Sequence, residues 1–206
     1  MKFFALLLLL PLSARAAITL PALFSDHMVL QSGKPVPVWG TADANTEITV
    51  SIAGQKKTAK ADAAGKWSLK LDALTASSEP QTLTIGDKTI NDVLVGEVWL
   101  GSGQSNMAMN VQSAKDYETS QAEAKLPQIR MFTEGSAAAD TAQTQCKGAW
   151  IICSPETVGR FSATAYFFGR TIHLALKTPV ASSIPPSVAH PSSRGSVLRR
   201  RRPART

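Results

Sequence analysis

The chain has 206 residues, of which 44% are apolar, so it can bury a substantial core and does not have the composition of a disordered polypeptide. Its formal net charge is +7, but eight of the 22 basic residues lie within the first 16 residues or after Val180, and the other 14 face 15 acidic residues. The body of the protein is therefore nearly neutral. Binding to a nucleic acid would depend on the arginine run 199–202, which has no interleaved aromatic residues. We therefore expect no nucleic-acid partner.

The first 16 residues have the pattern of a secretory signal peptide. Lys2 gives a positive start, residues 3–10 form an apolar run, and Ala14 and Ala16 form an A-x-A cleavage signature. A membrane anchor would need about 20 apolar residues, and this run is much shorter. We expect a mature chain that begins near Ala17, is secreted or periplasmic, and has no stable membrane insertion.

Residues 17–92 have the pattern of a β-rich domain. Polar and apolar residues alternate over Glu47–Ile52, 67–71 and 81–85, as expected for strands that bury one face. Gly86 and Asp87 suit a two-residue hairpin loop. We therefore predict an antiparallel β-sandwich domain of short strands.

After residue 92 the pattern changes to α/β. Residues 93–100 predict a strand buried on both faces, 106–125 a helix, and 129–132 a second strand. A second helix is expected to begin near Ser162, with an apolar stripe formed by Ala165, Phe168, Ile172 and Ala175. The alanine-rich segment 135–144 is expected to be a surface loop. This alternation predicts a parallel sheet within residues 93–180.

The glycine-rich turn after the apolar strand, at 101–107, is the strongest functional signal. Such a strand-to-helix turn can hold a serine hydroxyl at the rim of a sheet, and Ser105 is the candidate nucleophile. A serine of this kind needs a base to take its proton and N–H donors for the oxyanion. Gly103 would shape the turn, and Asn106 would cap the helix or donate a hydrogen bond.

The string GEVWLGSGQSNM at 96–107 resembles the first sequence block of the sialate O-acetylesterase family, a branch of the SGNH hydrolases. LFSDHMVLQ at 23–31, PVWG at 37–40, CSPETV at 153–158 and YFFGR at 166–170 are also similar to family segments. The resemblance implies a three-layer α/β esterase domain, here the part at 93–180. It also implies that Ser105 attacks acetyl esters of sialic acids or related glycans, without metal or organic cofactor. Plant-type xylan acetylesterases have a similar block.

The base that would activate Ser105 is not evident. In the family it belongs to an Asp-x-x-His motif far downstream, and this sequence has no such motif. His27 is expected to be structural or exposed, and His173 to be structural on the helix after Ser162. His190 lies in the C-terminal segment.

The resemblance stops at Val180. Reading residues 181–195 in a shifted frame, with suitable third codon bases, gives a segment similar to the family's next strand and Gly-Gly-Thr turn. We therefore expect residues 181–206 to be an out-of-frame, disordered tail, produced by a frameshift or a sequencing error. Because a serine esterase loses most of its rate without its base, we expect this truncated chain to be inactive.

Two further points stay open at the sequence level. Cys146 and Cys153 could form one disulfide in an oxidising compartment, although a buried free cysteine is the simpler interpretation. The alternative function is a non-catalytic carbohydrate-binding or scaffold β module with a vestigial hydrolase segment. An arginine-rich tail that binds anionic polymers is a third and weaker hypothesis. The sequence does not indicate the oligomeric state.

Overall fold

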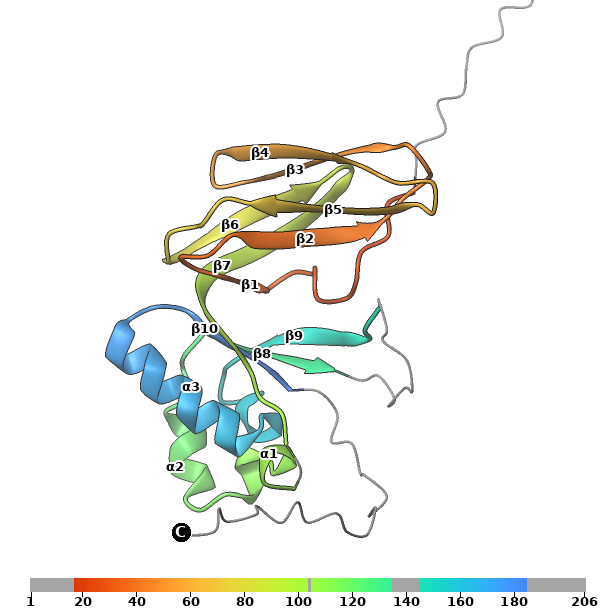
Figure 1. The fold of residues 1–206 in the computed structure, drawn as a ribbon. Helices are drawn as coiled ribbons and strands as arrows, with labels where there is room; N and C mark the ends of the chain where they lie inside the picture. The colour runs from red at the N-terminus through yellow and green to blue at the C-terminus, as the bar shows by residue number, and fades with distance from the viewer. Residues whose placement is uncertain (1–16, 104, 135–144, 185–206) are drawn as a thin grey trace, which may run out of the picture.

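The computed structural model describes residues 17–103, 105–134 and 145–184 (Figure 1). The expected signal peptide, the loop predicted at 135–144, and residues 185–206 lie outside the described residues. In Figure 1 the strands β1–β7 form a β-rich half, while the helices gather with β8–β10 in the other half. Strand β7 runs through both halves and joins them.

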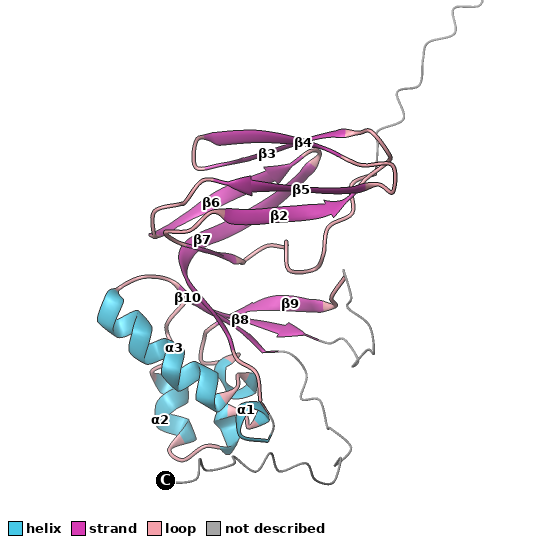
Figure 2. Ribbon diagram, in the orientation of Figure 1, coloured by secondary structure: helices cyan, strands magenta, loops and turns pink. Residues whose placement is uncertain are grey.

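Most of the strands belong to one sheet with the order β4-β3-β6-β7-β10-β8-β9, and β1 pairs with β7 outside this path (Figure 2). A separate two-stranded sheet consists of β2 and β5. The strands are β1 Val29–Gln31, β2 Val36–Thr41, β3 Glu47–Ile52, β4 Gln55–Lys60, β5 Lys66–Leu71, β6 Ser77–Ile85, β7 Lys88–Leu100, β8 Ile129–Glu134, β9 Gly148–Ile152 and β10 Val180–Ile184.

The strands expected from alternation in the first half are confirmed. In β3 the side chains of Ile48, Val50 and Ile52 are buried, while the residues between them are partly exposed. Burying a side chain of this size contributes about 1.5–3 kcal/mol. The hairpin between β6 and β7 is confirmed as well, because Ile85 pairs with Lys88 across the two-residue loop. Gly86 adopts φ +58, the left-handed conformation that such loops require.

The predicted parallel sheet is also confirmed. Strand β10 lies between β7 and β8 and is parallel to both, whereas β9 is antiparallel to β8. The prediction that residues 93–100 are buried on both faces holds only for the first part of the segment. The side chains from Val93 to Val95 are fully buried, but Trp99 and Leu100 are 43% and 74% exposed. The reason is that β7 extends past the core at its C-terminal end.

Residues 181–184, which we expected to be part of a disordered tail, instead form most of β10. Small side chains explain the fit, because Ala181 and Ser182 are buried between two neighbouring strands. Gly96 of β7 allows the start of β10 to lie close beside it, because a Cβ at position 96 would lie only 2.0 Å from the carbonyl oxygen of Pro179. That carbonyl accepts the Glu97 N–H at 2.9 Å. The expectation for residues 185–206 stays a prediction.

The single helix predicted at 106–125 is wrong. The segment forms α1 Ser105–Ala108, a 3-10 turn Val111–Ser113, and α2 Tyr117–Ala122. Hydrogen bonds to a distant segment interrupt it: the Val111 N–H donates to the Phe161 carbonyl, and the Met109 carbonyl accepts from the Ala163 N–H. Asp116 then adopts φ +58, which separates the turn from α2.

The second helix, α3 Ala163–Leu176, begins where the sequence predicts, and the Ser162 hydroxyl accepts a hydrogen bond from the Ala165 N–H. Its predicted apolar stripe is only partly confirmed: Ala165 is buried and Ile172 is partly buried, but Phe168 is 41% exposed and Ala175 is exposed. The buried face carries Tyr166 and Gly169 instead. A Cβ on Gly169 would lie 3.4 Å from Val180, so this glycine lets α3 pack closely on β10.

The buried residues form two clusters. The larger contains the inward side chains of β1–β3 and β5–β7 and also Phe132, Trp150 and Ala181 from the second half of the chain. The smaller lies beneath α3 and includes Met131, Cys153 and Tyr166. The predicted domain boundary at residue 92 would fall inside β7. The larger cluster contains residues from before and after this position in the sequence. The division into a sandwich domain and an esterase domain therefore stays a prediction.

Candidate functional site

Ser105 lies just beyond the C-terminal end of β7, at the first residue of α1 (Figure 1). Its side chain is exposed. The Gly101 N–H donates to the Ser183 carbonyl at 2.9 Å, so the pairing of β7 with β10 continues one residue past the strand before the chain turns. The serine is thus placed at the edge of the sheet where the parallel strands β7, β10 and β8 end, as the sequence predicts. In open α/β sheets, ligands bind at this edge.

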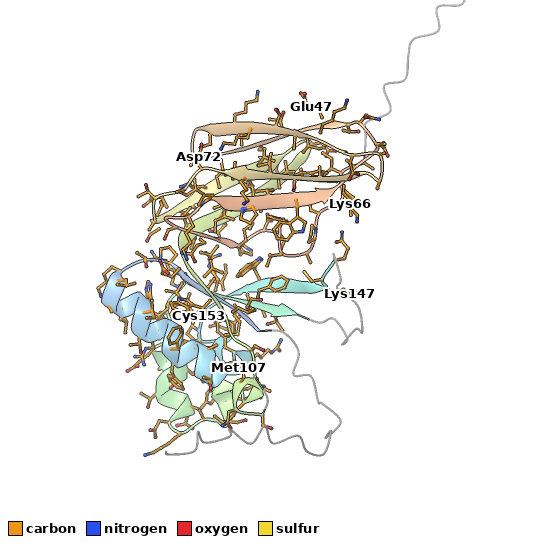
Figure 3. The ribbon with its side chains drawn as sticks, viewed as in Figure 1. Glu47, Lys66, Asp72, Met107, Lys147 and Cys153 are labelled. Carbon is orange, nitrogen blue, oxygen red and sulfur yellow. The ribbon has the colours of Figure 1, made fainter. Side chains whose placement is uncertain are left out.

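Contacts with the start of α3 hold the segment after Ser105. The Thr164 hydroxyl donates to the Asn106 carbonyl at 3.0 Å, and the Ser162 hydroxyl lies 3.5 Å from the sulfur of Met107. Figure 3 labels Met107 near α1. Within α1 the Met109 N–H donates to the Ser105 carbonyl. The position of Ser105 therefore depends on residues nearly 60 positions further along the chain.

Gly103 and Asn106 flank the serine, as expected, but their roles differ from a simple turn and cap. Gly103 does not adopt a positive φ. Its importance is close packing, because a Cβ there would lie 3.1 Å from the Cβ of Met107. The Asn106 side chain is exposed, and only its main-chain carbonyl makes a described contact, with Thr164. The amide group makes no hydrogen bond with any residue that the structure describes.

Neither described histidine bonds to Ser105. The Nδ1 atom of His27 lies 2.7 Å from the Asp92 carboxylate, and the Nδ1 atom of His173 lies 2.7 Å from the Thr178 carbonyl. Both rings make structural contacts, which agrees with the expectation for each. His190 lies outside the described residues. Within residues 17–103, 105–134 and 145–184, no base is in hydrogen-bond contact with the candidate nucleophile.

His27 belongs to an ionic cluster that sequence reasoning missed. Arg130 is 4% exposed and its guanidinium donates to both oxygens of the Asp92 carboxylate, at 2.9 and 3.3 Å, and to the His27 carbonyl at 3.1 Å. Burial opposes ionisation of Asp92, but hydrogen bonds and positive charge from Arg130 and His27 outweigh it, so its pKa lies below the usual value. The cluster joins the chain before β1 to β7 and β8.

The two cysteines are both free thiols in the structure. Cys153 is buried and its thiol donates to the Ala124 carbonyl. Burial raises the pKa of this thiol to about 12, so almost no thiolate exists at neutral pH. Cys153 is therefore a core residue and not a second candidate nucleophile.

The described residues contain neither a cluster of metal-ligating side chains nor a membrane-spanning helix. No group of three or more His, Cys, Asp or Glu side chains is arranged to hold a metal ion. None of the helices in the same ranges has both the length and the apolar character needed to cross a bilayer.

Exposed aromatic side chains gather beside the strand ends, a feature that sequence reasoning also missed. Trp99 of β7 and Phe168 of α3 pack edge to face, with ring centroids 5.0 Å apart. An apolar cleft of about 490 Å³ lies at the same place and is lined by residues that include Trp99, Leu100 and Ser183. The continuous apolar run at 93–100 predicted that Trp99 and Leu100 are buried, but β7 extends past the core and leaves them accessible.

Comparison with known proteins gives a consistent result. The sialate O-acetylesterase of Rattus norvegicus is 28% identical over 181 residues, covering 75% of this chain and 33% of the rat protein. The sialate O-acetylesterase of Mus musculus is 25% identical over 178 residues, with the same coverage. The chain therefore spans about a third of the length of these curated relatives. No family model matches the sequence.

A solved structure is similar in fold as well as in sequence. It is a carbohydrate acetylesterase from Xanthomonas citri, which is 34% identical and superposes with a TM-score of 0.77. The match covers 82% of this chain and 40% of that one.

Proposed function

Because the chain belongs to the sialate O-acetylesterase family, we propose that it comes from a carbohydrate esterase that removes O-acetyl groups from sialic acids or related glycans. The single observation that carries this proposal is the exposed Ser105 at the turn from the central parallel strand β7 into α1. The names of the rat, mouse and Xanthomonas relatives support the reaction class. We propose a secreted or periplasmic location from the N-terminal pattern.

In the proposed reaction the Ser105 oxygen attacks the acetyl carbonyl carbon while its proton passes to a base. The tetrahedral oxyanion collapses, the bond from the acetyl carbon to the sugar oxygen breaks, and the sugar leaves after gaining a proton. Water then attacks the acetyl-enzyme and releases acetate, restoring the hydroxyl. Backbone N–H groups of the turn at Gly103 and the Asn106 amide are proposed to stabilise the oxyanion.

We further propose that the 206-residue chain is inactive. The proposal is supported by the contacts of His27 and His173, which engage Asp92 and Thr178 rather than Ser105. Loss of the base from such a unit costs about a million-fold in rate. The active form would be the in-frame protein, in which the sequence after Val180 follows the shifted reading frame. Sequencing the gene across codons 175–210 decides whether that frame exists.

The test is hydrolysis of 4-nitrophenyl acetate by the 206-residue chain, by the in-frame protein, and by two variants of the latter. Ser105→Ala removes the proposed nucleophile. Ser102→Ala is the matched control, because Ser102 is an exposed serine of the same turn. We expect the in-frame protein and the Ser102→Ala variant to hydrolyse the ester, and the Ser105→Ala variant to lose at least about a thousand-fold. Equal rates for the two variants would remove the esterase assignment of Ser105.

A further inference from the structure

Strand β7 is longer than the strand that pairs with one of its edges. β1 pairs with β7 only as far as Gly96, while β7 continues to Leu100 in the direction of α1 (Figure 1). The Ser32 N–H donates to the Gly96 carbonyl at 2.8 Å, and the chain then turns away at Gly33, whose N–H donates to the Leu74 carbonyl. Among the described strands, none pairs with this edge of β7 after Gly96.

Main-chain groups of β7 therefore face an edge that has no neighbouring strand. The Glu97 N–H donates to the Pro179 carbonyl, on the β10 side, at 2.9 Å. Neighbouring residues of a strand direct these groups to opposite edges, so Val98 and Leu100 present theirs on the side that β1 has left. The Val98 N–H bonds there to a side chain, the Gln31 amide oxygen, at 3.0 Å. An open strand edge of this kind is a template for pairing with a further strand.

Both faces of β7 are apolar beside this edge. On one face the ring of Trp99 packs against Phe168 of α3, and both rings remain exposed. The Leu100 side chain points to the other face, where it is 74% exposed and lines the apolar cleft of about 490 Å³ together with Leu30 and Trp39. Exposed apolar patches of this kind mark interaction sites. A strand that covered the edge would be buried on both faces, so its own residues would be mostly apolar.

The length of the relatives indicates what covers the edge. The chain covers 33% of the rat and mouse esterases and 40% of the Xanthomonas structure, so more than half of each relative has no counterpart in it. In the in-frame protein proposed above, the remainder follows Val180, which begins the strand β10 next to β7. Consecutive elements of a sheet are usually neighbours in space. A strand of the same polypeptide also has a higher effective concentration at this edge than a second copy.

We propose that the edge of β7 at residues 98–100 binds an apolar β-strand from the part of the longer esterase that this chain does not contain. The strand packs on Trp99 and Phe168 with one face and fills the cleft beside Leu100 with the other. It adds a further strand to the edge of the sheet that carries Ser105. This inference rests on the proposed function in one respect, that the chain comes from a longer esterase, and it does not depend on the role of Ser105.

The first test compares hydrogen exchange of single main-chain amides in the 206-residue chain and in the in-frame protein. The Glu97 N–H is the internal reference, because its acceptor, the Pro179 carbonyl, precedes the shifted frame and is present in both proteins. Relative to Glu97, we expect the Leu100 N–H to exchange at least about a hundred-fold more slowly in the in-frame protein, because there it is bonded to the added strand.

The second test introduces Leu100→Lys into both proteins. Leu176→Lys is the matched control, because Leu176 is an exposed leucine at the far end of α3. In the 206-residue chain both substitutions should change Tm by less than about 2 °C, since both side chains are exposed. In the in-frame protein Leu100→Lys should lower Tm by at least about 5 °C, because it places a charge beneath the added strand. Leu176→Lys should again change Tm by less than about 2 °C.

The two tests support each other. If the 206-residue chain does not stay folded, the two in-frame variants still decide the question. If the in-frame Leu100→Lys variant does not fold, the exchange of the unmodified proteins decides it.

Four results would overturn the proposal. The first is equal relative exchange of the Leu100 N–H in the two proteins, and the second is an equal Tm for the two in-frame variants. The third is protection of Leu100 in the in-frame protein that rises with protein concentration, which would assign the edge to a second copy. The fourth is a gene without the in-frame continuation. Ester hydrolysis is not a readout in either test, so a failure here is separate from a failure of Ser105 as the nucleophile.

Discussion

Ser105 is held by a few contacts rather than by its own short helix. Helix α1 has four residues, too few to be stable alone, so its position depends on the segment that begins α3. The glycine and serine pattern identified the nucleophile candidate, because a strand followed by a glycine-rich turn is a local signal. The Thr164 contact could not be predicted, since nothing local links position 164 to position 106.

Thr164→Val tests this contact. It removes the hydroxyl that donates to the Asn106 carbonyl at 3.0 Å while keeping the shape of the side chain. We expect kcat of the in-frame protein to fall about ten-fold with KM nearly unchanged, because the nucleophile is positioned less well. Thr164→Ser, which keeps the hydroxyl, should restore the rate. A fall in kcat of equal size in both variants would show that the hydroxyl does not position the serine.

The thiols give a second prediction at this scale. Cys153 is buried with a pKa of about 12, whereas Cys146 is partly exposed. In the folded protein at pH 8 we expect one thiol to react with 5,5′-dithiobis(2-nitrobenzoic acid), and two to react after denaturation without reductant. Replacing Cys146 with serine should leave none reactive in the folded state. Finding no reactive thiol in the denatured, unreduced protein would mean that the two cysteines form a disulfide.

At the scale of elements, periodicity was informative where one face packs on a continuous core and misleading elsewhere. The alternation in β3 predicts its burial because both neighbours of the strand lie in the sheet. The helical pattern at 106–125 failed, because the Val111 N–H donates to the Phe161 carbonyl and the Ala163 N–H donates to the Met109 carbonyl, and these bonds override a local preference. Strand β10 was missed because Ala181 and Ser182 have weak strand propensity, and their place between two strands decides their structure.

The ionic cluster that joins these elements should make stability depend on pH. The pKa of Asp92 is lowered in the folded protein. The ionised carboxylate therefore stabilises the fold at pH values above the unfolded pKa of about 3.9, and this stabilisation is lost as the pH falls through the lower folded pKa. Asp92→Asn keeps the shape, and asparagine tolerates the φ of +53 at this position. We expect the variant to lose about 1–3 kcal/mol in the free energy of unfolding at pH 7. The difference should shrink towards pH 3.

Asp72→Asn is the control for this experiment. Asp72 pairs with Lys57 at 2.6 Å, but its side chain is 76% exposed, and exposed pairs contribute little. Urea unfolding curves at several pH values measure both variants. A loss for Asp72→Asn as large as that for Asp92→Asn, or a difference for Asp92→Asn that does not change with pH, would contradict the account of the cluster.

At the scale of the whole molecule, β7 connects the β-rich half to the half that carries Ser105. The class of fold followed from the change in sequence pattern near residue 92, but the continuous strand and the shared core could not be predicted from it. The same strand presents the exposed Trp99 and Leu100 at its end. The chain corresponds to about a third of its curated relatives, and we propose that the partners of Ser105 belong to the remainder.

The central claim is that Ser105 forms a covalent acetyl intermediate. The most direct test is to mix the in-frame protein with 4-nitrophenyl acetate, quench with acid within seconds, and locate the acetyl group by peptide mass spectrometry. We predict that the acetyl group is found on Ser105 and disappears when the quench is delayed. An acetyl group on Ser102 or another residue, or none during active turnover, would contradict the account.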